Sequence, residues 1–255
     1  MRAVLLICRK ELNAYFASPI AYLLMAFFAL IFGFVIFNAT TDFLRFSFQM
    51  QFQGGGGPMS INDQIITPLL GFSSTITLFL IPMITMRLFA EEKRSGTIEL
   101  LLTSPITDLQ IILGKWLGAM LLFACILVMS MINVALLFAW GKPDIKPVLV
   151  AYLGLLLQGG CLLAIGALIS TMTKNQIIAG GVTFFVCLLL WLLSWSTAND
   201  VGVLPQVINY LSIVTHFDNF SKGVLESKDV IFYLSMIFFA LFVTSRAMES
   251  LRWRA

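Results

Sequence analysis

The ionisable and nucleophilic residues of this chain do not form the arrangements that side-chain catalysis needs. A loop that holds ATP reads GxxxxGK[ST], but Lys115 is followed by Trp116, and Lys142 is followed by Pro143. Intramembrane proteolysis or acyl transfer needs a serine in a glycine elbow with a histidine, paired aspartates in the spans, or HExxH, and the sequence contains none of these patterns. The single histidine, His216, is isolated, and we interpret it as structural rather than as a general base. We therefore expect no catalytic residue, and the chain is not predicted to be an enzyme.

The composition is that of a membrane protein. Hydrophobic residues make up 59% of the chain and charged residues 11%, with a mean hydropathy of +0.95, whereas soluble domains are about 25% charged. The net charge of +3 is too small and too scattered for a nucleic-acid surface. Cys8, Cys125, Cys161 and Cys187 lack disulfide or zinc spacing and are interpreted as small buried residues, so no metal or cofactor is expected in this chain.

Charge-free segments define the expected fold. A charge at the bilayer centre costs about 2.5–3.5 kcal/mol, so membrane spans should lie between the charged residues. We predict an all-α integral membrane protein with one transmembrane domain over residues 1–255. The segment 201–217 contains Pro205, Asn209 and His216 and is predicted to be an external re-entrant or interfacial helix. The six predicted spans cover about 19–38, 65–87, 109–140, 148–172, 176–197 and 229–248.

The basic residues predict the orientation. Six spans put both termini on one side, and eleven of the 16 Lys and Arg residues fall on that side against five on the other. Both termini are therefore expected in the cytoplasm, together with the segment 87–108, while 38–63 and 197–228 are expected outside. The terminus side holds Arg2, Arg9, Lys10, Arg87, Lys93, Arg94, Lys115, Lys174, Arg246, Arg252 and Arg254, and the other side holds Arg45, Lys142, Lys146, Lys222 and Lys228.

Two segments beside the first span have patterns of their own. Residues 2–17 form a moderately amphipathic pattern, which predicts a helix on the cytoplasmic interface, or alternatively the frayed start of the first span. Residues 46–53 alternate Phe or Met with Ser or Gln, and this period of two predicts an extended, strand-like stretch before the flexible Gly54–Gly57 run. That stretch is interpreted either as an apolar loop on lipid headgroups or as an edge offered to an external partner.

The spans contain uncharged polar and small residues that suit a pathway or an interface. The charge-free runs of the spans, the sixth of which covers 230–245, contain no carboxylate, which counts against ion-coupled transport. Ser73, Ser74 and Thr77 of the second span could line a path or bond back to their own helix. Gly180 and Gly181, like the small residues at 160, 164, 166 and 170, could receive a helix of the same chain or of another subunit.

The polar segment between the second and third spans, 87–115, is the most informative. Ser95-Gly96 is a plausible helix start and Pro105 a stop, which predicts a short helix over about 96–105 with an apolar face of Ile98, Leu101 and Leu102. Such a helix beneath the membrane suits docking into a groove on another protein, or lying on lipid.

This segment resembles that of the permease subunits of ABC-2 type transporters. In that family a stretch close to E-[KR]-x-x-G-T-x-E-x-L-L-x-x-P joins spans two and three, and a Gly-Lys pair opens the next span. Arg9-Lys10-Glu11-Leu12 before Ser18-Pro19 is similar to the interfacial helix of the family. Segments 10–22 and 79–115 look most like the permease associated with gliding motility in Bacteroidetes. The matching residues are Glu92, Lys93, Gly96, Thr97, Glu99, Leu101, Leu102, Pro105, Gly114 and Lys115.

The resemblance implies a non-catalytic subunit of an exporter in the bacterial inner membrane. It implies a separate ATPase dimer that binds ATP and Mg²⁺, a second permease copy or a homologous subunit, and a companion with a large extracytoplasmic domain. On this basis Glu92 and Glu99 are predicted to make polar contacts to the ATPase, and Leu101 and Leu102 an apolar plug. The full set of predicted coupling residues is Glu92, Gly96, Thr97, Glu99, Leu101, Leu102 and Pro105.

Two other functions fit the same features. An ATP-driven transmitter would work an extracytoplasmic partner without passing a substrate, and it would keep a dry interface where a transporter needs a polar or enlargeable cleft. A passive membrane scaffold would lack ATPase coupling altogether. The uncharged interior favours lipids, hydrophobic compounds or peptides over small ions as the substrate, although large glycans also suit rings of neutral and aromatic groups.

Overall fold

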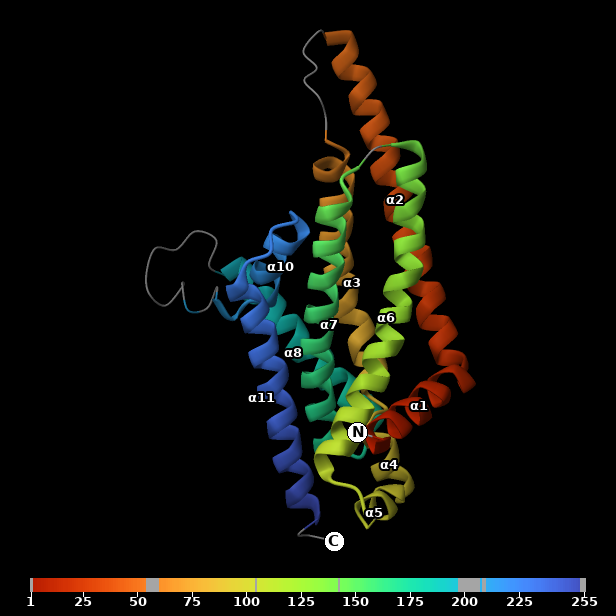
Figure 1. The fold of residues 1–255 in the computed structure, drawn as a ribbon, viewed down its shortest axis with the longest axis vertical. Helices are drawn as coiled ribbons and strands as arrows, with labels where there is room; N and C mark the ends of the chain where they lie inside the picture. The colour runs from red at the N-terminus through yellow and green to blue at the C-terminus, as the bar shows by residue number, and fades with distance from the viewer. Residues whose placement is uncertain are drawn as a thin grey trace.

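The chain folds into a bundle of long helices, shown in Figure 1. The computed structural model describes residues 2–53, 60–103, 105–141, 143–196, 207 and 210–252, and none of these residues forms a strand. The elements are α1 (Arg2–Ala17), α2 (Pro19–Gln53), the π-helix η1 (Asn62–Ile66), α3 (Thr67–Thr85), α4 (Ala90–Ser95), α5 (Thr97–Leu102), α6 (Asp108–Trp140), α7 (Ile145–Met172), α8 (Gln176–Ser196), α10 (Ile213–Ser221) and α11 (Ser227–Arg252).

Six of these helical segments are long and apolar enough to cross a membrane. The predicted all-α membrane fold is therefore confirmed, with 90% of the structure helical. The six candidate spans are Pro19–Gln49, Asn62–Ser95, Asp108–Ala139, Ile145–Met172, Gln176–Leu193 and Ser227–Ser250.

The two ends of the bundle differ. One end, called here the terminal end, carries α1, α4, α5 and the C-terminal part of α11, as Figure 1 shows. The other end, the distal end, carries η1 and the C-terminal part of α2, and α10 lies on that half of the bundle. Because α4 and α5 lie at the same end as α1, segments that are far apart in the sequence can build one polar site there.

The extended stretch predicted at 46–53 is wrong, because α2 continues as a helix to Gln53. No glycine or proline follows Gly33 before Gly54, and a helix that has formed extends at little cost. Asn38, Thr40, Thr41 and Ser47 also direct their side-chain donors to carbonyls three or four residues earlier, within the helix. The 35 residues of α2 span about 52 Å at 1.5 Å per residue, against a hydrocarbon thickness of about 30 Å.

The predicted N-terminal helix is present as α1, and a break at Ser18 separates it from α2. Cys8 and Tyr15 are its buried residues, while Leu5 is 66% exposed. Of the segment 201–217, the structure describes Val207 and residues from Tyr210 onward, and the helix observed there is α10.

The core is built around α3 and α7, whose apolar windows are each 67% buried inside the protein. Glycines on α7 let neighbouring helices approach: a Cβ on Gly154 would lie 2.5 Å from Phe220 of α10, and one on Gly166 would lie 2.4 Å from Thr85 of α3. Gly166 therefore belongs to packing within the chain, which is one of the two readings left open for the small residues of this span.

A second close approach brings α1 onto α6. A Cβ on Gly114 would lie 2.7 Å from Ile7 Cβ and 3.0 Å from the Val4 carbonyl oxygen, and one on Gly118 would lie 2.8 Å from Glu11 Cβ. Gly114 and Gly118 form a GxxxG spacing, which lets two helix backbones cross closely. This crossing sets the position of Glu11 above the first turns of α6.

We predict that Gly114→Ala destabilises the protein by about 1–3 kcal/mol, because the backbone of α1 would have to move away from α6. Gly33→Ala is the matched control, since a Cβ there meets nothing within 4 Å and alanine favours a helix more than glycine does. Thermal unfolding in detergent measures both variants. Equal midpoints for the two would contradict the close crossing of α1 and α6.

Candidate functional site: the charged junction at the terminal end

The polar segment between α3 and α6 forms two short helices joined by Gly96. Gly96 ends α4 with φ of +75°, a left-handed conformation that glycine adopts without strain. The helix predicted over 96–105 is observed only as α5, six residues long, and it ends before Pro105. Ser95 does not start α5: its hydroxyl donates to the Glu91 carbonyl of α4 and lies 2.9 Å from the Thr97 hydroxyl.

The first turn of α4 is held by the end of α7. The Ser170 hydroxyl accepts hydrogen bonds from the Phe89 and Ala90 backbone N–H groups, both at 3.1 Å. These donors have no partner within their own helix, so a side chain from α7 acts as the helix cap. Lys93 adds a hydrogen bond from its ammonium to the Thr171 carbonyl. As a result, α4 cannot shift without pulling on α7.

The central contact of the site is an ion triad around Lys115 of α6. The Lys115 ammonium lies 2.8 Å from Glu11 of α1 and 2.9 Å from Glu92 of α4, and its side chain is only 3% exposed. The Phe89 ring lies 5.3 Å from the same ammonium, which adds a cation–π contact. Because each charge is largely removed from water, the three groups depend on one another for neutralisation. The triad therefore ties α1, α4 and α6 together.

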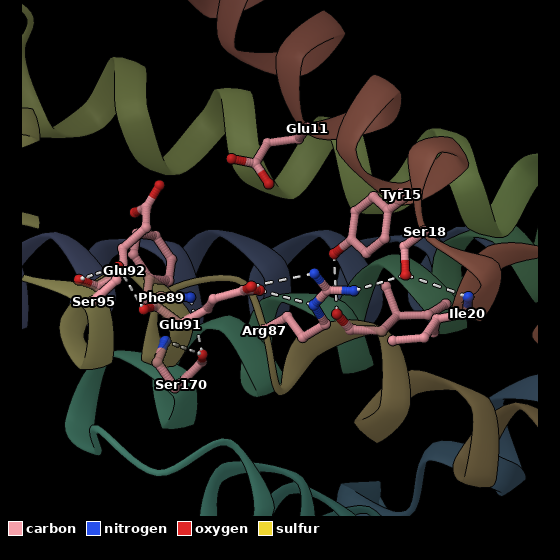
Figure 2. A network of polar contacts seen from close by, with 12 residues as sticks. Glu11, Tyr15, Ser18, Ile20, Arg87, Phe89, Glu91, Glu92, Ser95 and Ser170 are labelled. Carbon is pink, nitrogen blue, oxygen red and sulfur yellow. Dashed lines mark hydrogen bonds and ion pairs between the residues drawn. The ribbon is translucent and has the colours of Figure 1, made fainter. Parts of the chain in front are cut away.

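A second ion pair connects α4 to the break between α1 and α2. Arg87 binds both carboxylate oxygens of Glu91, at 2.8 and 3.3 Å, and donates to the Ser18 hydroxyl at 3.3 Å. Figure 2 shows Arg87 between these two partners. Tyr15 donates to the Ile84 carbonyl at 3.0 Å, and burial raises the pKa of its hydroxyl well above the ordinary value, so the group stays neutral.

A cleft of about 610 Å³ opens beside these ion pairs, between α1 and the two short helices. Three cations and three acids line it, and one oxygen of Glu92, Oε2, is buried there without a hydrogen-bond partner among the described residues. The cleft is thus polar but balanced in charge. Its lining residues are Lys10, Glu11, Ala14, Arg87, Glu91, Glu92, Ser95, Thr97, Leu100, Ile106 and Lys115.

The structure separates the predicted coupling residues into two groups. Glu92 faces inward to Lys115, and only 16% of its side chain is exposed. Thr97, Glu99 and Pro105 are exposed at the terminal end, as is Leu100 at 73%, whereas Ile98 packs against the core. The side chains of Leu101 and Leu102 lie outside the described residues. Contact of any of these residues with an ATPase stays a prediction.

Of the candidate pathway or interface residues, those on α3 are buried, whereas Gly181 of α8 is exposed. Ser73 and Thr77 are fully buried, and their hydroxyls donate to the Leu69 and Ser73 carbonyls of α3 itself. Ser74 is 2% exposed. Gly180 faces the end of α3, where a Cβ would lie 3.4 Å from Met86, while a Cβ on Gly181 would meet nothing within 4 Å. The hydrogen bonds of Ser73 and Thr77 agree with the interpretation in which these side chains bond back to their own helix.

Sequence reasoning did not assign the partners that build this site. Lys115 was counted among the basic residues on the side of the termini and matched to a family motif, although a lysine that opens an apolar segment of this length signals a buried cation in need of an acid. Glu11 carried the same signal, since it interrupts an amphipathic pattern. Gln158 of α7 was missed as well: it is fully buried, and neither polar atom of its amide has a partner among the described residues.

Comparison with known protein families matches residues 5–248 to the family described as ABC-2 family transporter protein. The chain belongs to this family. The match includes the ion pairs of Glu11, Arg87, Glu91, Glu92 and Lys115 at the terminal end. It also includes α10 and the six candidate spans up to residue 248, so the terminal-end site is part of the family domain. No curated protein matches the chain.

This ABC-2 protein is accordingly a membrane permease subunit of an ABC transporter, a class that is generally non-catalytic and pairs with an ABC ATPase subunit.

We predict that Lys115→Met destabilises the permease by about 3–5 kcal/mol, because it leaves Glu11 and Glu92 buried without a cation. Adding Glu11→Gln and Glu92→Gln to Lys115→Met should recover most of the loss. Arg246→Met is the control, since the Arg246–Glu249 pair is exposed and should contribute no more than about 1 kcal/mol. Thermal unfolding in detergent compares the variants. If Lys115→Met unfolds at the same temperature as Arg246→Met, the triad does not contribute to the stability of the folded protein.

Proposed function

We propose that this permease is the membrane subunit of a bacterial inner-membrane exporter, with its terminal end in the cytoplasm. A separate pair of ATPase subunits would bind ATP and Mg²⁺ and dock against α5. A second permease copy or a homologous subunit would complete the membrane part. The eleven basic residues on the side of the termini support this orientation.

The observation that carries the proposal is the contrast between α5 and α4. The outer face of α5 is exposed through Thr97, Glu99 and Leu100, while α4 is bonded to α1 and α6 through Lys115 and to α7 through Ser170. A force applied to α5 by a partner would therefore pass through Gly96 and α4 to three other helices. In this mechanism ATPase closure tilts the helices against one another and moves the permease between two states.

We predict that Glu99→Arg lowers recovery of the ATPase with the purified permease at least tenfold, because the reversed charge would face the docking partner. Vanadate-sensitive ATPase activity of the complex should fall in parallel, while the amount of folded permease stays unchanged. Glu226→Arg reverses a charge outside this site and should leave both readouts unchanged. Copurification in mild detergent with mass spectrometry measures the partners. Wild-type recovery with Glu99→Arg would exclude this docking surface, and a permease that never copurifies with an ATPase would favour a scaffold.

The length of α2 supports a second candidate function, transmission of force to an extracytoplasmic partner of the gliding-motility type. Its last turns extend beyond the thickness of a bilayer, and Leu44, Phe48 and Phe52 lie four residues apart there, exposed by 50%, 59% and 89%. Lipid tails would not cover this stripe at such a distance. A companion protein with a large external domain would cover it.

For this second function we predict that Leu44→Arg combined with Phe48→Arg removes any external companion from the purified complex but leaves the ATPase bound. Gln49→Arg adds a charge on another face of the same helix and serves as the control. Mass spectrometry of the copurified proteins gives both results in one measurement. A companion that is retained by the double variant would argue against transmission through the end of α2.

A further inference from the structure

The outer face of α1 carries positive charges without a negative one. Arg2 and Arg9 are both exposed on this face, and their spacing of seven residues places them about two turns apart on one side of the helix. Glu11, the one acid of α1, lies on the opposite side and binds Lys115 of α6. The ion pairs found in the described part of the chain include neither arginine. This face therefore presents two cations to its surroundings.

An apolar flank of α1 runs beside these cations. Leu5, Leu12 and Phe16 follow one another at helical spacing, and Leu12 and Phe16 pack partly against the core, whereas Leu5 is 66% exposed. The Phe16 ring meets the Tyr22 ring edge-on, with 6.0 Å between their centres. Tyr22 lies in the first turn of the span α2 and is 56% exposed. The apolar flank of α1 is thus continuous with the exposed apolar surface of a membrane span.

The opposite flank of α1 faces the cleft at the terminal end, which Lys10 and Ala14 line. Figure 1 shows that α1 lies across the end of the bundle rather than along it. The helix crosses α6 at Gly114, next to Lys115, which is the last charged residue before an apolar run that extends to Trp140. A helix that lies crosswise at the boundary between charged and apolar residues, with one apolar flank, is typical of a membrane interface.

We propose that the outer face of α1 binds anionic phospholipids, with Arg2 and Arg9 on the headgroup phosphates and Leu5 among the acyl chains. Arg2 and Arg9 lie between the apolar flank and the cleft flank, which places them at the height of the headgroups. Leu5 lies three residues after Arg2 and four before Arg9, so its side chain can enter the lipid beside both cations. A guanidinium suits this ligand because its N–H groups bind two phosphate oxygens at once. The assignment to the cytoplasmic leaflet rests on the orientation in the proposed function.

Lipid bound to this face stabilises the charged junction as well. Glu11 lies on the inner side of the same helix, where its carboxylate meets Lys115 at 2.8 Å. The close crossing at Gly114 and Gly118 leaves α1 little room to shift on α6. A headgroup that holds α1 at the membrane surface therefore also holds Glu11 at Lys115. Because such a ligand binds the folded protein and not the unfolded one, it raises the unfolding temperature.

Stability in bilayers of defined charge tests the proposal. We expect the full-length permease to unfold several degrees higher in nanodiscs that contain phosphatidylglycerol than in nanodiscs of phosphatidylcholine alone, with a smaller difference at high salt. Arg2→Gln combined with Arg9→Gln should abolish the difference. The control, Arg94→Gln combined with Arg246→Gln, removes the same charge from exposed positions at the same end and should keep it. An Arg2 and Arg9 double variant that retains the full difference would overturn the proposal.

Counting the bound lipid gives a second readout. When the permease is released from mixed nanodiscs, native mass spectrometry should show phosphatidylglycerol retained over phosphatidylcholine by about fivefold, the factor that one cation supplies near an anionic surface. The double variant of Arg2 and Arg9 should show no preference, and an equal preference in both proteins would contradict the assignment of these residues.

Two further results distinguish the lipid from other ligands of the same face. Inorganic phosphate added to phosphatidylcholine nanodiscs should leave the unfolding temperature unchanged, and a rise as large as that with phosphatidylglycerol would assign the arginines to a soluble anion. Loss of a copurified ATPase from the double variant of Arg2 and Arg9, with unchanged lipid retention, would assign the face to that subunit. Either result would overturn the proposal. The nanodisc measurements use the permease alone, so their outcome is independent of the proposed pairing with an ATPase.

Discussion

The buried cation of Lys115 is the interaction on which the terminal end of the permease depends. A lysine ammonium that is almost removed from water needs a negative partner, and this one has two, on α1 and α4. The need to neutralise one charge therefore brings together segments that are 81 and 104 residues apart, from Glu11 to Glu92 and from Glu11 to Lys115. The GxxxG crossing of α1 on α6 then sets the distance over which these bonds can form.

At the terminal end, the two short helices α4 and α5 differ in how firmly they are held. Hydrogen bonds and ion pairs hold α4 on three sides, whereas α5 is attached through a left-handed glycine and presents its outer face to the surroundings. A segment with few internal bonds can adapt to a partner, and a segment with many can pass on a displacement without deforming. In the proposed mechanism, this combination would let the permease respond to the ATPase subunits with which its family pairs.

In the distal half of the molecule, a different pair of buried polar side chains holds two helices together. There, His216 and Asp229 hold a short helix against the start of a span, and their side chains are 4% and 1% exposed, against 3% for Lys115. Between the two charged sites the candidate spans are filled by apolar side chains and by hydroxyls such as those of Ser73 and Thr77, which bond to their own helix. The permease thus concentrates its charged contacts near the ends of the spans, where the cost of removing a charge from water is lowest.

The sequence by itself determined the membrane fold and the number of candidate spans, because the cost of placing charges in hydrocarbon leaves long apolar gaps that can be read directly. The family followed from the resemblance of the segment 87–115 to a known motif, and the comparison with protein families shows it. It did not determine the path of α2, since a period of two in Phe46–Phe52 is a weaker constraint than the cooperative extension of a helix already formed. Only the tertiary structure decided that Glu92 faces Lys115, that Ser170 caps α4 and that His216 meets Asp229. Pairing of this kind depends on how helices cross in three dimensions, and the spacing of residues along one chain does not specify that crossing.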